Sequence, residues 1–187
     1  AEGAATEAIE AGIQLVVLIT EGVPVHATMR LRARARAAGA RLLGPTTPGI
    51  IAPERTKIGI MPAQLFSRGS VGVISRSGTL SYEMGGLLSD AGIGQSPETR
   101  VIVLIGEVGG SQEERAARHI ATAIDKPVVA YIAGRSVPSG VRMGHAGAIV
   151  QGSSGSAEEK IQAFADAGVR TAAHPAEVVD LVRHCLT

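Results

Sequence analysis

The feature that most constrains the fold is a series of short, continuously apolar segments, each separated from the next by a helix-forming stretch. The apolar segments are LVVLI at 15–19, VGVIS at 71–75, VIVLI at 101–105 and PVVAYIAG at 127–134. Runs this short and rich in β-branched residues are typical of strands that are covered on both faces of a parallel sheet. They are also too short to span a bilayer. The alternation predicts an α/β fold in which helices connect parallel strands.

Helices are predicted between and after these segments, and glycine marks the end of several of them. The predicted helices cover residues 4–11, 26–38, 78–91, 112–124, 157–167 and 175–186, and a further short strand is predicted at 41–43. The sequence GPTTPG at 44–49 interrupts the pattern with two prolines and two glycines, and the chain from there to Gly69 is expected to be irregular. We therefore predict two domains, residues 1–46 and residues 47–187.

The composition is that of a globular protein with a substantial core, and it narrows the range of partners. The chain has 187 residues, of which 45% are hydrophobic and 19% are charged. Its 18 basic and 17 acidic residues leave a net charge of +1, so neither a nucleic acid nor a membrane surface is an expected partner. Aromatic residues make up 2% of the chain, which argues against a stacking platform for single-stranded nucleic acid.

The one local basic cluster and the one cysteine are both interpreted as ordinary features. Arginine alternates with apolar residues at positions 30, 32, 34 and 36, and in a helix this spacing spreads the side chains around the circumference. We interpret the cluster as solvated surface rather than as a phosphate site.

The single Cys185 excludes an intramolecular disulfide and fits a reducing compartment. Because the start of the chain lacks the features of a signal peptide, we expect a cytoplasmic protein.

Three glycine-containing segments follow predicted strands, and the loops at the carboxyl ends of parallel strands meet at one edge of a sheet. They are SRSGT at 75–79, GEVGG at 106–110, and the segment from Gly134 that leads into RMGHAGAIV at 142–150. We therefore expect these three segments to face one another.

The first segment is a candidate anion site because it opens a predicted helix. Free backbone N–H groups and the helix dipole at such a position favour a phosphate, and nearby hydroxyl groups add donors. The candidate phosphate-binding residues are Ser75, Ser77, Gly78 and Thr79. The alternative is an ordinary N-cap by Ser77.

The other two segments each contribute one titratable side chain. Glu107 is a carboxylate near glycines at a strand end, and the alternative to a functional role is that it is simply solvated. His145 is surrounded by glycine and alanine, which leave the imidazole accessible to a large group; the alternative is an incidental histidine in a flexible loop. A nucleophilic histidine needs an acceptor for its second ring nitrogen, and Glu107 suits that role. With anion-binding groups nearby, the set predicts phosphoryl transfer through His145.

Several longer motifs resemble, in order and spacing, those of the α subunit of succinyl-CoA synthetase, also called succinate–CoA ligase. They are GPTTPGIIAPERTKIGIMP, SVGVISRSGTLSYE, LIGEVGG, KPVVAYIAGRSVPSGVRMGHAGAIV and AEEKIQAFADAGV. The resemblance covers nearly the whole chain, and SRSGTL, GEVGG and RMGHAGAI are its most specific parts. It implies a partial Rossmann-like CoA-binding domain in residues 1–46, followed by a flavodoxin-like parallel-sheet domain in residues 47–187 that carries the phosphohistidine loop.

The resemblance also implies an activity and a set of partners. An enzyme of this family forms a phosphohistidine, then an enzyme-bound acyl phosphate, and passes the acyl group to CoA. It works with an ATP-grasp β subunit, as αβ or α2β2, that binds ATP or GTP with Mg; no metal site is predicted in the present chain. The roles implied here are phosphorylation for His145, its carboxylate partner for Glu107, contact with the carboxylic acid for Tyr82, and contact with CoA for Ile19, Thr20 and Glu21.

The sequence departs from the family pattern in three places. It begins midway through the family's CoA-binding domain, without the first glycine-rich CoA loop. Between Ser96 and Pro97 the family carries a further strand and loop of about two dozen residues, which exceeds ordinary loop variation. The usual Asn-Cys pair of GPNCPG is replaced by Thr46 and Thr47, which places in doubt any contact of that pair with the active histidine.

Three functions are consistent with these motifs. The first is the α subunit of an ADP- or GDP-forming ligase that joins succinate to CoA. The second is a related ligase for malate or another small dicarboxylic acid. The third, from another class, is a non-catalytic CoA-binding regulatory subunit, although simple binding does not require His145, Glu107 and the SRSGT turn to occur together.

Overall fold

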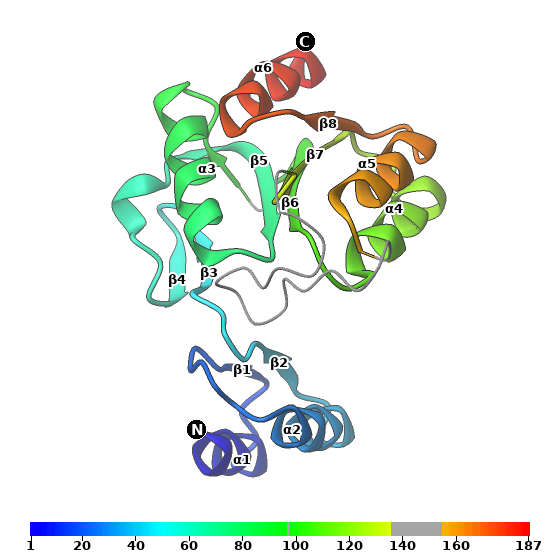
Figure 1. Ribbon diagram of the computed structural model, residues 1–187. Coiled ribbons are helices and arrows are strands. Elements are labelled where there is room, and N and C mark those ends of the chain that lie inside the picture. Colours follow the sequence, from blue (N-terminus) through cyan, green and yellow to red (C-terminus); the bar gives the residue numbers. More distant parts are fainter. Residues whose placement is uncertain (97, 136–154) are drawn as a thin grey trace. The chain divides into compact units, whose positions relative to one another are not determined.

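The computed structural model describes residues 1–96, 98–135 and 155–187, which form two compact units (Figure 1). The units are Ala1–Ala63 and Gln64–Thr187. This division falls later in the chain than the predicted boundary after Thr46, because the residues that follow Thr46 form a hairpin that groups with the first unit. Among the described residues, every helix is too short or too polar to cross a membrane.

The first unit is built on two parallel strands and two helices. Its elements are α1 (Glu2–Glu10), β1 (Leu15–Val17), α2 (Val25–Ala37) and β2 (Arg41–Leu43). The strands pair in parallel with Val16 opposite Leu42. The core is formed by small and branched apolar residues, namely Ala5, Ile9, Val16, Leu18, Leu31 and Ala35. In α2 the buried residues Ala27, Leu31 and Ala35 are four apart, so they share one face of the helix.

The arginines of α2 lie on the solvent side of that helix. Arg30 forms an ion pair with Glu2 at 2.9 Å, and Arg34 forms one with Glu10 at 3.1 Å. All four of these side chains are well exposed, so each pair adds little stability. The interpretation of this cluster as solvated surface is confirmed for these two arginines.

A β-hairpin follows, where the sequence analysis predicted irregular chain. Its strands are β3 (Gly49–Ala52) and β4 (Thr56–Gly59), paired antiparallel with Gly49 opposite Gly59. Both glycines have positive φ, and a Cβ on Gly59 would lie 2.4 Å from the carbonyl oxygen of Pro48. The prediction was wrong because the strands are short and none of their residues is buried, so they lack the alternation of apolar and polar residues that marks a half-buried strand.

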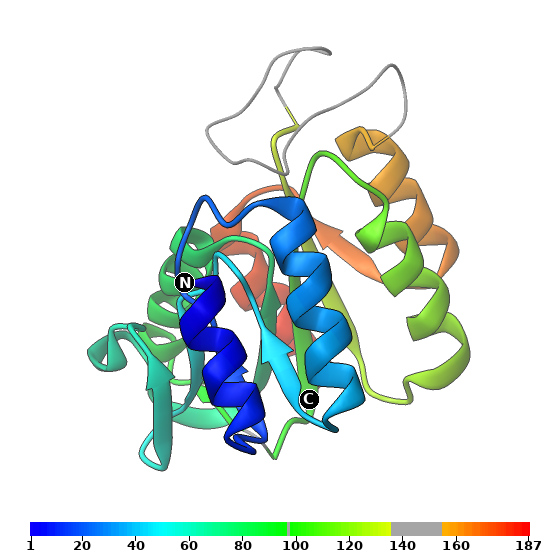
Figure 2. The same ribbon diagram turned by 90° about the horizontal axis from the view of Figure 1, so that it is seen from below.

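The second unit is a four-stranded parallel sheet with helices on both faces (Figures 1 and 2). After a single 3-10 turn at Ala63–Leu65 come β5 (Arg68–Ser75), α3 (Gly78–Asp90), β6 (Val101–Glu107), α4 (Gln112–Ala123), β7 (Val128–Ala133), α5 (Ala157–Asp166), β8 (Arg170–Ala172) and α6 (Pro175–Leu186). The strand order is β5-β6-β7-β8. The predicted α/β class is therefore confirmed, while β8 was missed because its three residues, Arg-Thr-Ala, contain no run of branched apolar side chains.

Alternate residues of β6 divide the core of this unit into two layers. Val101, Val103 and Ile105 pack with α3 and α6 on one face. Leu104 packs with α4 and α5 on the other face. The second layer covers β5 less completely, since Ile74 is 61% exposed on this edge strand.

Candidate functional site

The carboxyl ends of β5, β6 and β7 lie at one edge of the sheet. Ser75 of β5 is opposite Ile105, and Glu107, the last residue of β6, is opposite Ala133 of β7. The loops that leave these strands therefore start side by side, as the sequence predicted for the first two segments. His145 lies outside the described residues.

The turn after β5 is held by its own hydroxyl groups. The Ser75 hydroxyl donates to the carbonyl oxygen of Ser77 at 2.7 Å and accepts from the Ser77 amide at 3.0 Å. The Ser77 hydroxyl accepts from the amide of Leu80 at 3.3 Å, so Ser77 is the N-cap of α3. This is the alternative role that the sequence analysis kept open for Ser77. The amides of Gly78 and Thr79 have no acceptor among the described residues, and they remain the candidates for binding an anion.

Glu107 is buried at the end of β6, with 7% of its surface exposed. The alternative that this residue is simply solvated is therefore wrong. Its amide donates to Glu113 Oε1 at 3.2 Å, and its carbonyl oxygen accepts from Arg76 Nη1 at 3.4 Å. Its carboxylate Oε1 is 3.6 Å from Arg76 Nη2. The backbone of Glu107 thus contacts both Arg76 in the turn after β5 and Glu113 on α4, and its side chain contacts Arg76.

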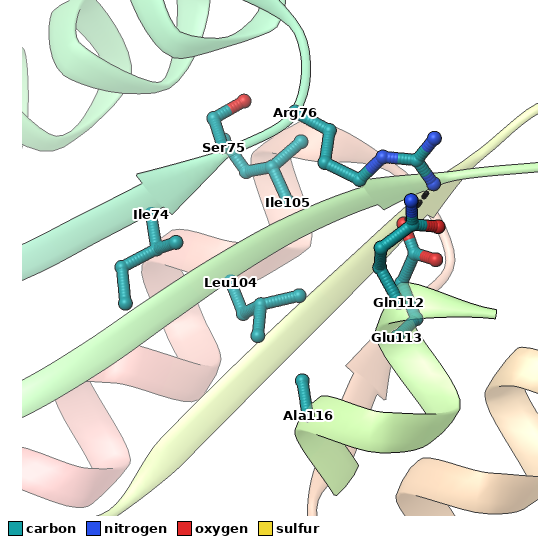
Figure 3. Close-up of a pocket in the computed structure, with 8 residues that line it drawn as sticks. All are labelled: Ile74, Ser75, Arg76, Leu104, Ile105, Gln112, Glu113 and Ala116. Carbon is teal, nitrogen blue, oxygen red and sulfur yellow. Dashed lines mark hydrogen bonds and ion pairs between the residues drawn. The ribbon is translucent and has the colours of Figure 1, made fainter. Parts of the chain in front are cut away.

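Arg76 connects the turn after β5 with the loop after β6. Its Nη1 donates to Glu113 Oε1 at 2.7 Å and to the carbonyl oxygen of Gly109 at 3.1 Å. Figure 3 shows the guanidinium reaching across the end of β6 toward Glu113 on α4. The two side chains line a hollow of about 150 Å³ on the open part of the sheet face, together with Ile74, Ser75, Leu104, Ile105, Gln112 and Ala116.

Lys160 joins α5 to the same cluster and is fully buried, with 0% of its surface exposed. Its ammonium group donates to Glu113 Oε2 at 2.7 Å and to the carbonyl oxygen of Gly110 at 2.9 Å. It also forms an ion pair with Glu114 at 3.1 Å. Buried charges are tolerated in proteins when they are paired and hydrogen-bonded, and here each oxygen of the Glu113 carboxylate has a cationic donor.

The close approach of Glu113 to β6 requires a glycine at position 106. A Cβ on Gly106 would lie 2.6 Å from Cγ of Glu113 and 2.8 Å from Cδ1 of Ile132. Real Cβ atoms do not approach side chains this closely. The first glycine of the GEVGG motif, Gly106, therefore makes room for the Glu113 side chain, whose carboxylate binds Arg76 and Lys160.

The sequence analysis did not identify Arg76, Glu113 or Lys160 as functional candidates. For Lys160 the signal was its spacing, because it lies three residues after Ala157 and four before Phe164, both of which are buried. A lysine on the apolar stripe of a helix indicates a buried partner. For Glu113 no comparable signal exists, since an acidic residue in the first turn of a helix is ordinary.

Opposing effects act on the pKa of Glu113. Burial of the carboxyl raises its pKa, but hydrogen bonds from Lys160 and Arg76, together with the charges of both, outweigh burial. The net result is a pKa below the ordinary value of 4.5. Because the folded pKa is lower than the unfolded one, Glu113 contributes stability that is present above about pH 4.5 and is lost as the pH falls through the folded pKa.

We therefore predict that part of the acid sensitivity of this chain disappears in Glu113→Gln. The wild-type urea midpoint should fall as the pH is lowered below 4.5, and the variant, though less stable at neutral pH, should lose less over the same range. The measurement is urea unfolding followed by circular dichroism from neutral pH to pH 3. Parallel losses in the two proteins would contradict the prediction. Glu158→Gln, which changes an exposed carboxylate of α5, is the matched control.

The described residues on either side of positions 136–154 lie against the loop after β6. The amide of Val108 donates to the carbonyl oxygen of Ala133 at 3.2 Å, and Gly134 packs against the Val108 side chain. The amide of Gly109 donates to the carbonyl oxygen of Gly155 at 2.8 Å. The loop that follows Glu107 thus contacts the chain immediately before and after the segment to which His145 belongs.

The remaining candidates lie at three other positions. Ile19, Thr20 and Glu21 follow the carboxyl end of β1, where Ile19 is half-buried and the other two are exposed. The carbonyl oxygen of Thr20 accepts from the amide of Thr46 at 3.2 Å, so this loop adjoins the loop after β2. Thr46 has a φ of 58°, a conformation that is unusual for a β-branched residue and easier for asparagine. Tyr82 is half-buried on α3 in the second unit.

Comparison with known proteins gives a consistent family assignment. Residues 91–170 match the CoA-ligase family. The chain is 45% identical to succinate–CoA ligase [ADP-forming] subunit alpha 2 of Archaeoglobus fulgidus, with 100% of this chain and 73% of the relative covered. It is 43% identical to the corresponding alpha subunit of Aquifex aeolicus, with 100% and 70% covered.

Solved structures agree with this assignment at the level of the fold. ATP citrate lyase from Methanothrix soehngenii, determined with citrate and coenzyme A, matches with a TM-score of 0.81 and 26% identity over 100% of this chain. The match covers 38% of that protein's chain, so the present chain spans less than two fifths of its length. The apo acetyl-coenzyme A synthetase 1 of Ca. Korarchaeum cryptofilum matches with a TM-score of 0.70 and 24% identity, which shows a shared fold alone; 92% of this chain and 43% of that one are covered.

The curated relatives are also longer in the aligned region. The alignment with the first Archaeoglobus relative runs over 211 positions, whereas the present chain has 187 residues. The relative therefore carries residues that this chain lacks, a difference that the sequence analysis placed between Ser96 and Pro97; Pro97 lies outside the described residues. Despite this difference in length, the identity of 45% extends across the whole chain, and the protein therefore belongs to the family of succinate–CoA ligase α subunits.

Proposed function

We propose that this chain is the α subunit of a ligase that joins succinate to CoA through a phosphohistidine at His145, with Glu107 as the carboxylate partner of that histidine. The observation that carries the proposal is the buried carboxylate of Glu107, held at the same sheet edge as the SRSGT turn. The relatives of this chain are named as alpha subunits of succinate–CoA ligases, which supports the same activity here.

The proposed reaction begins with attack by one ring nitrogen of His145 on the terminal phosphoryl group of a nucleoside triphosphate. A nitrogen–phosphorus bond forms, the bond to the leaving nucleotide breaks, and the imidazole becomes cationic. Glu107 would accept a hydrogen bond from the other ring nitrogen, which fixes the tautomer and stabilises the developing charge. The phosphoryl group then moves to a carboxylate oxygen of succinate. The sulfur of CoA finally attacks the acyl carbon, the bond from this carbon to the phosphate oxygen breaks, and the thiol proton leaves with the phosphate or to solvent as the thioester forms.

The SRSGT turn is the proposed binding site for the phosphoryl group during these transfers. Its candidate donors are the amides of Gly78 and Thr79 at the N-terminus of α3, where the helix dipole favours an anion. In this arrangement Ser75 acts on the phosphoryl group through the shape of the turn, because its hydroxyl donates within the turn. The Ser77 hydroxyl accepts from the Leu80 amide, so its own proton is proposed to be donated to the phosphoryl group. Tyr82 is proposed to contact the acid.

The proposed CoA contacts are Ile19, Thr20 and Glu21. They fit that role by position, since ligands of parallel α/β units bind beyond the carboxyl ends of the strands, and these residues directly follow β1. The triphosphate and Mg are assigned to an ATP-grasp β subunit. That a partner exists is supported by the name "subunit alpha" of the relatives.

The proposal is tested with the complex of this chain and its ATP-grasp partner. Release of nucleoside diphosphate is measured with CoA and either succinate, malate or another small dicarboxylic acid. We expect turnover that requires acid, CoA and triphosphate together and that is fastest with succinate. Faster turnover with malate would identify malate, and not succinate, as the substrate. Binding of CoA without any turnover would contradict the proposed activity and would indicate a non-catalytic regulatory subunit.

A further inference from the structure

We propose that Arg76 is a positioning residue for Glu107 and that Glu113 and Lys160 hold Arg76 in place. This inference rests on the proposed role of Glu107 in phosphoryl transfer, and it extends the site to three side chains outside the proposed reacting groups. It concerns only described residues of the second unit.

The Arg76–Glu113 ion pair contacts Glu107 at three points. Glu113 Oε1 accepts from the Glu107 amide at 3.2 Å, and Arg76 Nη1 donates to the Glu107 carbonyl oxygen at 3.4 Å. Arg76 Nη2 lies 3.6 Å from the carboxylate Oε1 of Glu107. One ion pair therefore contacts the backbone on both sides of the Glu107 Cα atom as well as the side chain. A displacement of the pair would move the carboxylate with it.

The pair is itself fixed from a third element. Lys160 of α5 donates to Glu113 Oε2 at 2.7 Å, which leaves Oε1 for Arg76 at 2.7 Å and for the Glu107 amide. Lys160 is fully buried, so its ammonium group has no solvent to replace a lost contact. Arg76 is anchored again by the Gly109 carbonyl oxygen at 3.1 Å. Glu113 and Arg76 thus connect four elements, namely β6, α4, α5 and the turn after β5.

The chemistry of arginine explains why this residue type stands at position 76. A guanidinium presents several N–H donors in a fixed fork, so one side chain reaches Glu113, Gly109 and Glu107 at once. Nη1 makes the contacts with Glu113, Gly109 and the Glu107 carbonyl oxygen, whereas Nη2 lies near the Glu107 carboxylate, and an ammonium group, with its charge at a single point, cannot make both sets of contacts. Arg76→Lys therefore keeps the charge near Glu113 but should release Glu107.

The experiment measures single-turnover phosphorylation in the complex with the ATP-grasp partner, using γ-labelled ATP. Arg76→Ala should lower the rate between about ten- and a hundred-fold, because a small misplacement of a catalytic group has effects of this size. In steady-state turnover of the same complex, the KM values for nucleotide and CoA should stay unchanged. Millimolar guanidinium should restore part of the rate, because Arg76 lines an open hollow that a small cation can enter. Arg118→Ala is the control, because Arg118 is exposed on α4. This variant should be phosphorylated at the wild-type rate, and guanidinium should not change that rate.

Each alternative outcome bears on a different claim. If the wild-type complex is not labelled, the proposed function fails and the positioning role fails with it. If the wild type is labelled and folded Arg76→Ala is labelled at the same rate, or does not respond to guanidinium, only the positioning role is overturned. Should Arg76→Ala fail to fold, Arg76→Lys takes its place, and full-rate labelling of that variant overturns the positioning role.

Discussion

Replacing Lys160 by methionine should lower the free energy of unfolding by about 3–5 kcal/mol, a large part of the stability of an ordinary domain. The methionine fills most of the space of the lysine stem but cannot donate to Glu113, Glu114 or the Gly110 carbonyl oxygen. The Glu113 carboxylate is then left buried with one oxygen unpaired, which is the principal source of the loss. Urea unfolding followed by circular dichroism measures the effect.

Two further variants separate this mechanism from a general effect of losing a lysine. Lys126→Met removes an exposed lysine from the same unit and should change the free energy of unfolding by less than about 0.5 kcal/mol. Adding Glu113→Gln to Lys160→Met should cost less than the sum of the two single changes, since the buried charge that lost its partner is also removed. A loss below about 1 kcal/mol in Lys160→Met, or strict additivity in the double variant, would contradict a buried ion pair at this position.

Three strands of the second unit, β5, β6 and β7, were predictable because they are long and contain continuous apolar runs. β6 and β7 are buried on both faces and appear in the sequence as the runs VIVLI and PVVAYIAG. β8 has only three residues, and its position follows from its pairing with β7 rather than from its own sequence. The β3–β4 hairpin was missed because its strands have only four residues each, pair with each other and contain no buried residue.

The candidate site was predictable to the extent that topology determines it. Parallel strands place Ser75 and Glu107 at one edge of the sheet whatever their detailed contacts are. The contacts of Glu107 were not predictable, because they run through Glu113, whose second carboxylate oxygen is bound by Lys160, 47 residues away in the chain. In the sequence, the spacing of Lys160 between Ala157 and Phe164 indicates a buried partner but does not identify it, and only the packing of α5 against α4 places Lys160 at Glu113.

The largest effect on chemistry is expected from His145→Asn, which should abolish labelling of this chain by γ-labelled ATP in the complex with its ATP-grasp partner. In the wild type the label should be stable to base and labile to acid, as a nitrogen-bound phosphoryl group is. His119→Asn is the matched control, because His119 is exposed on α4 and should be labelled like the wild type. Equal labelling of His145→Asn would place the phosphoryl group elsewhere and remove the basis of the proposed mechanism.

Glu107→Gln should give a graded result, and its size tests why a carboxylate stands at this position. The amide side chain keeps the shape and can still accept a hydrogen bond, but it lacks the negative charge that stabilises a cationic imidazole. We expect phosphorylation in a single turnover to slow about tenfold or more, with binding of the partner subunit unchanged. The free energy of unfolding should change little, because the backbone contacts of residue 107 with Arg76 and Glu113 do not involve the substituted group and the amide oxygen can still accept from Arg76. Unchanged labelling in Glu107→Gln would mean that the buried carboxylate serves only the ion pairs around Arg76, and His145 would then need another acceptor.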